Sequence, residues 1–276
     1  MLRKEKNKYD KQFNENLLQL KDSNPRAFWK IINKDRKKNK MGDIPQGELF
    51  NHFSNLSKSI SNQNSNPNSS TTESTTDISN DSINMPFILE ELKKHIIFLK
   101  NNKSHGIDYI LNEFLKNCPE ELLVVIVKFF NIILESGIVP NAWTIGIIKP
   151  LYKNKGDIND VNNYRGITLL SCLGKLFTSI LNSRLYAYLT RENILGNEQA
   201  GFRSQHSTLD HIFALHILSK FYIDQKKPSF CAFVDYSKAF DFVNRTHMWQ
   251  KLLSSNINGK VLNVIKNIYE NAKSQV

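Results

Sequence analysis

The sequence contains few cysteines, and their positions exclude two common uses of this residue. Its 276 residues include only Cys118, Cys172 and Cys231, which lie far apart and form no Cys-x-x-Cys pair. A disulfide framework or a structural zinc site needs cysteines at closer, paired spacing. Scattered cysteines are typical of reduced, buried side chains, so we expect an intracellular protein.

Long apolar runs and acidic side chains are also scarce. The longest apolar stretch, residues 122–134, is interrupted by Lys128 and Asn131 and is too short to span a bilayer. The charged residues 1–10 lack the apolar core of a secretory signal. With 26 acidic against 37 basic side chains, the net charge is +11. The sequence therefore predicts no membrane partner, and its charge fits either a nucleic-acid partner or a merely basic protein.

Composition divides the chain into three regions. Residues 1–53 are basic with helical apolar spacing, and their run Lys30–Lys40 fits either a solvated helix end or a phosphate-contacting arm. Residues 54–85 are rich in Ser, Asn and Thr and bury too little apolar surface to offset chain entropy, so we expect a disordered linker. Residues 86–276 mix helical and strand-like patterns, which indicates an α/β (α+β) domain.

Turn and capping residues set specific expectations for helices and strands. Near the N-terminus, Pro25 suits the first position of a helix capped by Ser23 or Asn24. Further helices are expected from Leu89 to Leu99, from Pro119 to Gly137, after Ser171, from Ser207 or Thr208 to Tyr222, and from Lys260 to Ala272. Strands are expected over Thr144–Tyr152 and Ser229–Asp235.

The apolar run that ends at Asp235 is the first candidate for chemistry. Such a short run predicts a buried strand, and a carboxylate at its end needs a cation or hydrogen-bond donors. Carboxylates combined with substrate phosphates are the usual protein ligands of Mg²⁺. Aspartate is also a common helix cap. The local sequence therefore leaves two roles open for Asp235, a metal ligand or the cap of a following helix.

Five motifs occur in one order along the chain. They are Lys103–Asp108, Ile147–Asp157, Asn163–Leu170, Glu198–Thr208 and Phe233–Asp241. In this order they resemble the motifs of non-LTR (LINE-type) retrotransposon reverse transcriptases, and Asn24–Asn33 resembles the stretch that often precedes that domain. The resemblance covers residues 86–250 approximately. It implies reverse-transcriptase-like fingers and an incomplete palm, preceded by a helical basic N-terminal segment.

The resemblance implies roles for the palm motif. Asp235 matches the first catalytic, metal-binding carboxylate, and the backbone carbonyl of Tyr236 is a further candidate oxygen ligand. The complete family site holds two Mg²⁺ ions. Phe240 matches the aromatic residue that lies against the sugar of the incoming nucleotide. From the residues alone, Phe240 fits an ordinary core aromatic equally well.

The other motifs imply contacts with nucleotide and template. Arg165 matches the arginine that holds the incoming triphosphate, and one of the neighbouring lysines is expected to contact phosphate. The candidates are Lys149, Lys153 and Lys155, whose alternative is a solvated turn. The segment Gly201, Phe202 and Arg203 matches a region near the template strand. Gly166 departs from the family, which has proline at that position, and this loosens the turn after the arginine.

The resemblance implies a segment of an RNA-directed DNA polymerase that uses an RNA template, a DNA primer and dNTPs, without a further small-molecule cofactor, in the nucleus or cytoplasm. No Asp-Asp pair follows Asp241, and no thumb follows the palm motif. One carboxylate cannot position two metals, so we expect this polypeptide alone to lack polymerase activity. The alternatives are a truncated, non-catalytic remnant that at most binds nucleic acid, and a scaffold with accidental matches.

Overall fold

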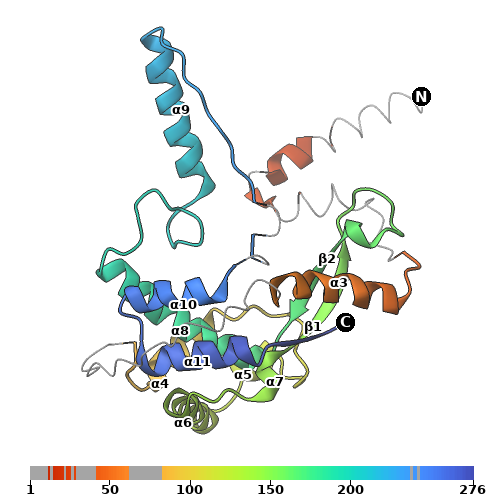
Figure 1. Cartoon of the computed structure of the whole chain (residues 1–276), viewed down its shortest axis with the longest axis vertical. Helices are drawn as coiled ribbons and strands as arrows, with labels where there is room; N and C mark the ends of the chain where they lie inside the picture. Colours follow the sequence, from red (N-terminus) through yellow and green to blue (C-terminus); the bar gives the residue numbers. More distant parts are fainter. Residues whose placement is uncertain are drawn as a thin grey trace. The chain divides into compact units, whose positions relative to one another are not determined.

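The computed structural model of the chain describes residues 42–61, 83–236, 239–240 and 243–276, together with residues 12, 15–21, 23–25 and 28 (Figure 1). The chain divides into two compact units. The first comprises Met1–Pro45 and Leu151–Arg165, and the second comprises Gln46–Pro150 and Gly166–Val276. All of the α-helices labelled in Figure 1 belong to the second unit.

Helices dominate the described chain and accompany one small sheet. The helices are α3 (Gln46–Ser61), α4 (Leu89–Ile97), α5 (Asn112–Lys116), α6 (Glu120–Ser136), α7 (Asn141–Thr144), α8 (Cys172–Arg191), α9 (Thr208–Asp224), α10 (Arg245–Ser254), α11 (Gly259–Glu270) and the 3-10 helix η1 (Val161–Asn163). Strands β1 (Ile145–Tyr152), β2 (Tyr164–Leu169) and β3 (Lys273–Gln275) form a sheet in the order β2–β1–β3. In the parallel pair of β1 and β3, Ile145 lies opposite Lys273. The expected α/β (α+β) class is confirmed, and none of the helices so described is long and apolar enough to cross a membrane.

The ends of three long helices follow the residues that predict them. Pro119 is the N-cap of α6, and Gly137 ends this helix in the left-handed region at φ +69°, where glycine has no steric cost. The Ser171 hydroxyl accepts a backbone hydrogen bond at the start of α8 (3.0 Å). Ser207 and Asp210 form a capping box at the start of α9. The predicted starts of these helices are confirmed.

An aromatic cluster lies at the centre of the core of the second unit. Phe130 of α6 meets Phe177 of α8 edge-on, with ring centroids 5.1 Å apart. Trp143 packs against both rings, at 5.9 Å from Phe130 and 5.5 Å from Phe177. Leu92 and Ile96 of α4 are buried in the same core, as their helical spacing predicts. Because aromatic pairs of this kind add about 0.5–1.5 kcal/mol each beyond area burial, the cluster holds α6, α7 and α8 together.

Two asparagine side chains fasten the segment that precedes α4. Asn84 accepts from the Val261 N–H of α11 (3.0 Å) and donates to the Asn258 carbonyl (3.2 Å). Asn131 of α6 accepts from the Phe87 N–H (2.6 Å) and donates to the Phe87 carbonyl (3.0 Å). Asn131 thereby satisfies backbone groups that the irregular segment cannot pair with itself, and Asn84 satisfies backbone groups at the start of α11.

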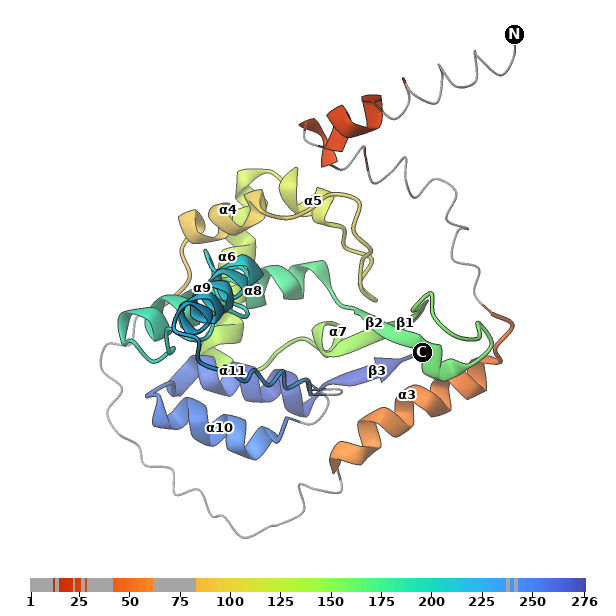
Figure 2. The same ribbon diagram turned by 90° about the horizontal axis from the view of Figure 1, so that it is seen from above.

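Helices α10 and α11 lie side by side in both ribbon views (Figures 1 and 2). Trp249 of α10 meets Tyr269 of α11 edge-on, with ring centroids 5.5 Å apart. Arg245, the first residue of α10, donates to the Tyr269 carbonyl (3.1 Å) and lies over the Tyr269 ring (5.5 Å). Helix α11 corresponds to the helix predicted over 260–272. Helix α10 was not predicted, and because none of its residues is buried, its apolar spacing carries little signal.

Helix α3 extends beyond the regional boundary that composition predicts at residue 53. Leu49 and Phe53, one turn apart, are both buried, and the helix continues past Phe53 to end at Ser61. Of the predicted linker 54–85, residues 62–82 lie outside the described residues, as does the run Lys30–Lys40.

The predicted cap near the N-terminus agrees with the backbone of the first unit. Pro25 is helical and Asn24 is not. The Phe28 N–H donates to the Asn24 carbonyl (3.1 Å). A non-helical residue whose carbonyl accepts the first helical hydrogen bond is an N-cap, and proline is well suited to the position that follows it.

The segment 229–235 is not the buried strand that its apolar composition predicts. Its residues have no regular structure, and Phe230, Phe233 and Val234 are 96%, 83% and 75% exposed. A strand requires a hydrogen-bonded neighbour, and in the described sheet β2 and β3 flank β1 on its two sides. The prediction was wrong because an apolar run specifies burial but supplies no pairing partner.

Candidate nucleic-acid interface

The turn between β1 and β2 is held in shape by its own hydrogen bonds, within the first unit. Tyr164 is buried; its hydroxyl donates to the Ile158 carbonyl (2.7 Å) and accepts from the Gly42 N–H (2.9 Å). Gly156 adopts φ +83°, and a Cβ there would meet the Asn163 side chain at 2.4 Å. The turn therefore has a defined conformation, and the backbone positions from which its surface side chains extend are fixed.

Exposed cations are carried by this turn and the adjoining strands. The Lys153 N–H donates to the Asn163 carbonyl (2.8 Å), and its ammonium group donates to a carbonyl of η1 (2.7 Å). Lys155 and Arg165 are exposed and make no ion pair with the described residues. Lys149 is exposed on the part of β1 that belongs to the second unit. A guanidinium presented from a fixed turn suits bidentate contact with phosphate, and the ammonium groups suit it as point charges.

Arg203 closes the loop between α8 and α9. Its Nη1 donates to the Gly196 carbonyl (2.8 Å) and the Gln199 carbonyl (3.3 Å). These bonds use only Nη1 of a guanidinium that has five N–H donors, and Nε is buried without a partner among the described residues. At Gly201, none of the atoms in the described part of the chain that are distant in sequence lies within 4 Å of the position a Cβ would take, which leaves open space at this backbone.

The structure brings together Phe202 and Phe240, which come from different motifs. Their ring centroids lie 5.8 Å apart, and the ring planes meet at 82°. Both rings are exposed, Phe202 at 89% and Phe240 at 77%, so Phe240 is not an ordinary core aromatic in the described chain. Phe202 has φ +62°, a conformation that is unusual for a bulky side chain. Exposed aromatic rings provide surfaces on which bases stack.

Asp235 and Tyr236 lie in the exposed, irregular segment that follows α9. Their carboxylate and carbonyl oxygens are ligand types that Mg²⁺ prefers. However, no three His, Cys, Asp or Glu side chains come together as a metal-binding group in the part of the chain that the structure describes. Asp241 lies outside that part. The described residues do not fit a two-metal centre, and Asp235 and Tyr236 could supply only some of its ligands.

The motif Lys103–Asp108 has a structural role that its sequence pattern did not reveal. The Ser171 hydroxyl donates to the Asp108 carboxylate (2.5 Å) across 63 positions of sequence. A Cβ on Gly106 would stand 2.4 Å from the Ser171 backbone nitrogen. This motif therefore packs directly on the point where the chain leaves β2 and enters α8. A glycine and an aspartate two residues apart signal a turn, but this spacing does not identify the distant segment that the turn contacts.

Residues 152–276 match the family described as "Reverse transcriptase (RNA-dependent DNA polymerase)". "Probable RNA-directed DNA polymerase from transposon BS" of Drosophila melanogaster is 34% identical over 160 residues, which are 57% of this chain and 17% of that protein. "RNA-directed DNA polymerase from mobile element jockey" of Drosophila funebris is 32% identical over 200 residues, 69% of this chain and 21% of that protein. The chain carries a reverse transcriptase segment of the non-LTR type.

This reverse transcriptase segment contains the turn with Arg165, the loop with Phe202 and the irregular segment with Asp235. The chain spans about a fifth of the length of the curated relatives it matches. The match over residues 152–276 confirms the resemblance to reverse transcriptases. The roles of individual residues stay predictions, because the comparison identifies a segment and assigns no function to single side chains.

Proposed function

We propose that the chain is part of an RNA-directed DNA polymerase and that its exposed motifs bind template–primer and nucleotide. The observation that carries this proposal is the family match over residues 152–276. That range includes the fixed turn with its exposed cations and the exposed aromatic pair. The partners are an RNA template, a DNA primer and dNTPs, and the protein acts in the nucleus or the cytoplasm, where such nucleic acids occur.

Arg165 and Lys153 are the proposed contacts for the triphosphate of the incoming nucleotide. Arg165 is exposed near the start of β2 and directly follows the buried Tyr164 in the sequence. A planar guanidinium can donate two parallel hydrogen bonds to one phosphate, which adds orientation to charge attraction. Lys149 is a further candidate, as an exposed cation on β1.

The loop around Phe202 is the proposed contact for the template. Phe202 and Phe240 offer ring faces and edges to bases and sugars, and Arg203 offers its remaining donors to a backbone phosphate. Asp235 and the Tyr236 carbonyl would take part in holding two Mg²⁺ ions when further carboxylates complete the site. Bound there, such ions would supply positive charge opposite the transferred phosphate.

Binding of a labelled RNA–DNA primer–template, measured by fluorescence anisotropy at several salt concentrations, tests the proposal. We expect affinity to fall steeply as salt rises, because each neutralised phosphate releases counterions. Arg165→Ala should weaken binding of template–primer with dNTP and reduce the salt slope by about one unit. Phe202→Ala should weaken binding without changing that slope, since stacking carries no counterion release.

Lys93→Ala is the matched control, because Lys93 is an exposed cation that pairs with Glu120 on another part of the surface. Equal effects of Arg165→Ala and Lys93→Ala on binding would contradict the assignment of Arg165. An affinity that does not change with salt concentration would contradict the nucleic-acid proposal as a whole. A primer-extension assay with Mg²⁺ and dNTPs separates binding from catalysis. We expect no extension by this polypeptide, because Asp235 alone cannot position two metals.

A further inference from the structure

Apolar side chains are distributed all round helix α9, among polar ones such as His211, His216 and Lys220, yet none of its residues is buried. Phe213, Leu218 and Ile223, for example, are 66%, 56% and 69% exposed. A helix that is hydrophobic all round normally lies in a protein interior. Its capping box shows that the sequence encodes a regular helix at this position. Helix α9 therefore needs a covering surface that its described contacts do not provide.

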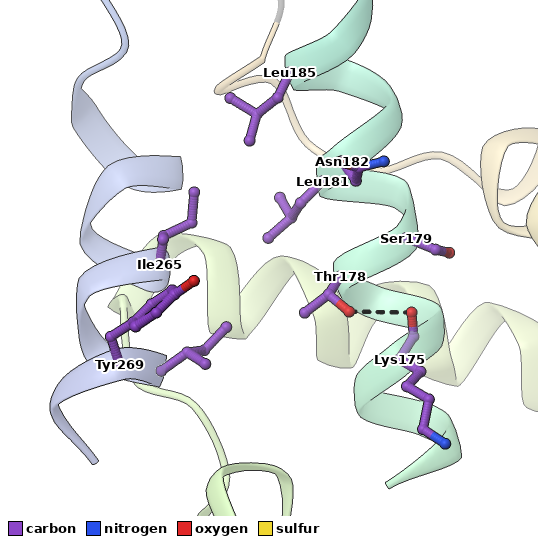
Figure 3. A pocket seen from close by; sticks show the side chains of 9 residues that line it. Lys175, Thr178, Ser179, Leu181, Asn182, Leu185, Ile265 and Tyr269 are labelled. Carbon is purple, nitrogen blue, oxygen red and sulfur yellow. Dashed lines mark hydrogen bonds between the residues drawn. The ribbon is translucent and has the colours of Figure 1, made fainter. Parts of the chain in front are cut away.

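The second unit has an apolar groove that none of the described helices fills. The groove lies between α8 and α11 and has a volume of about 550 Å³. Leu181 and Leu185 of α8 point toward α11, and Ile265 and Tyr269 of α11 line the opposite wall (Figure 3). Lys175 and Tyr269 lie at one end of the groove and Leu185 lies at the other (Figure 3).

One face of α9 matches this groove in length. Phe213, Ile217 and Phe221 recur every four residues on that face, and Asp224 follows on the same side of the helix. At the rise of an α-helix, Phe213 and Asp224 are about 16 Å apart along the axis. The groove residues Leu185 and Lys175 are about 15 Å apart by the same measure.

The geometry points to α9 of the same chain as the occupant of the α8–α11 groove, running antiparallel to α8. In this arrangement Phe213 lies beside Leu185, and Asp224 lies beside Lys175. The Asp224 and Lys175 side chains are both exposed and make no ion pair with the described residues, so their opposite charges are available to each other. The reverse orientation would place the N-terminal end of α9 beside Lys175, where Asp210 is already engaged with the Ser207 N–H (2.7 Å).

The connections on both sides of α9 allow this arrangement. The linker of residues 192–207 can extend to about 50 Å, which exceeds the length of the groove. After α9, the chain must return to Arg245, whose side chain contacts Tyr269 at the Lys175 end of the groove. With Asp224 at that same end, residues 225–244 have only a short distance to span. This inference does not depend on the proposed polymerase function.

Disulfide trapping tests the inference directly. In a Cys231→Ser background, the pair Lys175→Cys and Asp224→Cys is compared with the pair Lys175→Cys and Thr208→Cys, which probes the other end of α9. A disulfide needs Cα atoms about 4.4–6.8 Å apart, so only the first pair should cross-link under mild oxidation. Peptide mass spectrometry should assign the bond within one chain, with a yield independent of protein concentration.

Three outcomes would overturn the inference. Cross-linking of the 175/208 pair instead would reverse the orientation. A cross-link between two chains that grows with concentration would assign the groove to a second copy. No cross-link in either pair, with α9 amides that exchange as fast as an unprotected helix, would show that α9 does not occupy the groove.

Charge reversal gives a second measurement that needs no introduced cysteine. Lys175→Glu should speed hydrogen exchange of the α9 amides about two- to fivefold, the effect of losing one partly exposed ion pair. Adding Asp224→Lys to this variant should restore the original exchange rate. Lys93→Glu, which reverses a cation of α4, should leave α9 exchange unchanged. If the double variant exchanged as fast as the single one, the two side chains would not be partners.

Discussion

Arg184 of α8 and Glu91 of α4 form a bidentate ion pair, with Nε–Oε1 and Nη2–Oε2 distances of 2.7 Å. The two side chains are only 12% and 22% exposed. The same guanidinium donates to the Pro86 carbonyl (3.0 Å) and lies 4.3 Å from the centroid of the Phe87 ring. Arg184 therefore joins the segment before α4 to α8 by charge, hydrogen bonds and ring stacking together.

Replacing Arg184 should destabilise the fold far more than replacing an exposed cation. Arg184→Met should lower the free energy of unfolding by about 3–5 kcal/mol, because it leaves the Glu91 carboxylate largely buried without a partner. Lys93→Met is the control, since its ion pair with Glu120 is exposed and contributes about 0–1 kcal/mol. Urea denaturation of both variants measures the difference, and equal losses would show that Arg184 has no special role.

Glycine is required at residue 106 but not at residue 201. A Cβ at Gly106 would stand 2.4 Å from the Ser171 nitrogen and 2.7 Å from the Leu170 carbonyl carbon, and backbone atoms cannot move aside cheaply. Gly106→Ala should therefore cost about 1–3 kcal/mol of stability through forced backbone shifts. Gly201→Ala should change stability by less than about 0.5 kcal/mol, because its surroundings are open. Thermal unfolding of the two variants checks this, and a tolerated Gly106→Ala would refute the close approach.

Sequence patterns predicted the helices at which capping or helix-ending residues agree with the apolar periodicity. Pro119, Gly137, Ser171 and Ser207 each mark a helix end in the structure, because proline, glycine and serine act on the local backbone that they belong to. Strand pairing is different, since it depends on residues far apart in the chain. For this reason strand β1 was predicted by its apolar run, β2 and β3 were missed, and residues 229–235 were assigned wrongly.

The candidate site was accessible from sequence only through family motifs. Residue types and spacing alone left two roles open for Asp235, a metal ligand and a helix cap. The ring contact of Phe202 with Phe240, and the packing of Gly106 on Ser171, join segments that are distant in sequence. No local pattern encodes such contacts, so they were not predicted.

His95 should make the stability of the fold depend on pH. Its Nδ1 lies 2.9 Å from the Ser179 hydroxyl, and partial burial lowers the pKa of its imidazole from the ordinary 6.5, against the opposing attraction of Glu91. Below pH 6.5 the unfolded chain therefore binds a proton more readily than the folded chain does, so stability falls as pH decreases until the folded pKa is passed. His95→Gln should flatten this dependence. Urea denaturation from pH 7.5 to pH 5 measures it, and parallel curves for the two proteins would exclude His95 as the cause.

The three cysteines should differ sharply in reactivity toward a thiol reagent. Burial raises the pKa of the Cys118 and Cys172 thiols, and Cys172 is completely buried, so little reactive thiolate forms at either residue. Cys231 lies exposed in the irregular segment before Asp235.

We expect the native protein to incorporate one equivalent of a maleimide rapidly, at Cys231, as peptide mass spectrometry would show. Cys231→Ser should abolish the fast phase, and denaturation should then expose the other two thiols. Slow labelling of Cys231 would instead mean that residues 229–235 are shielded, as in the buried strand that their apolar composition predicts.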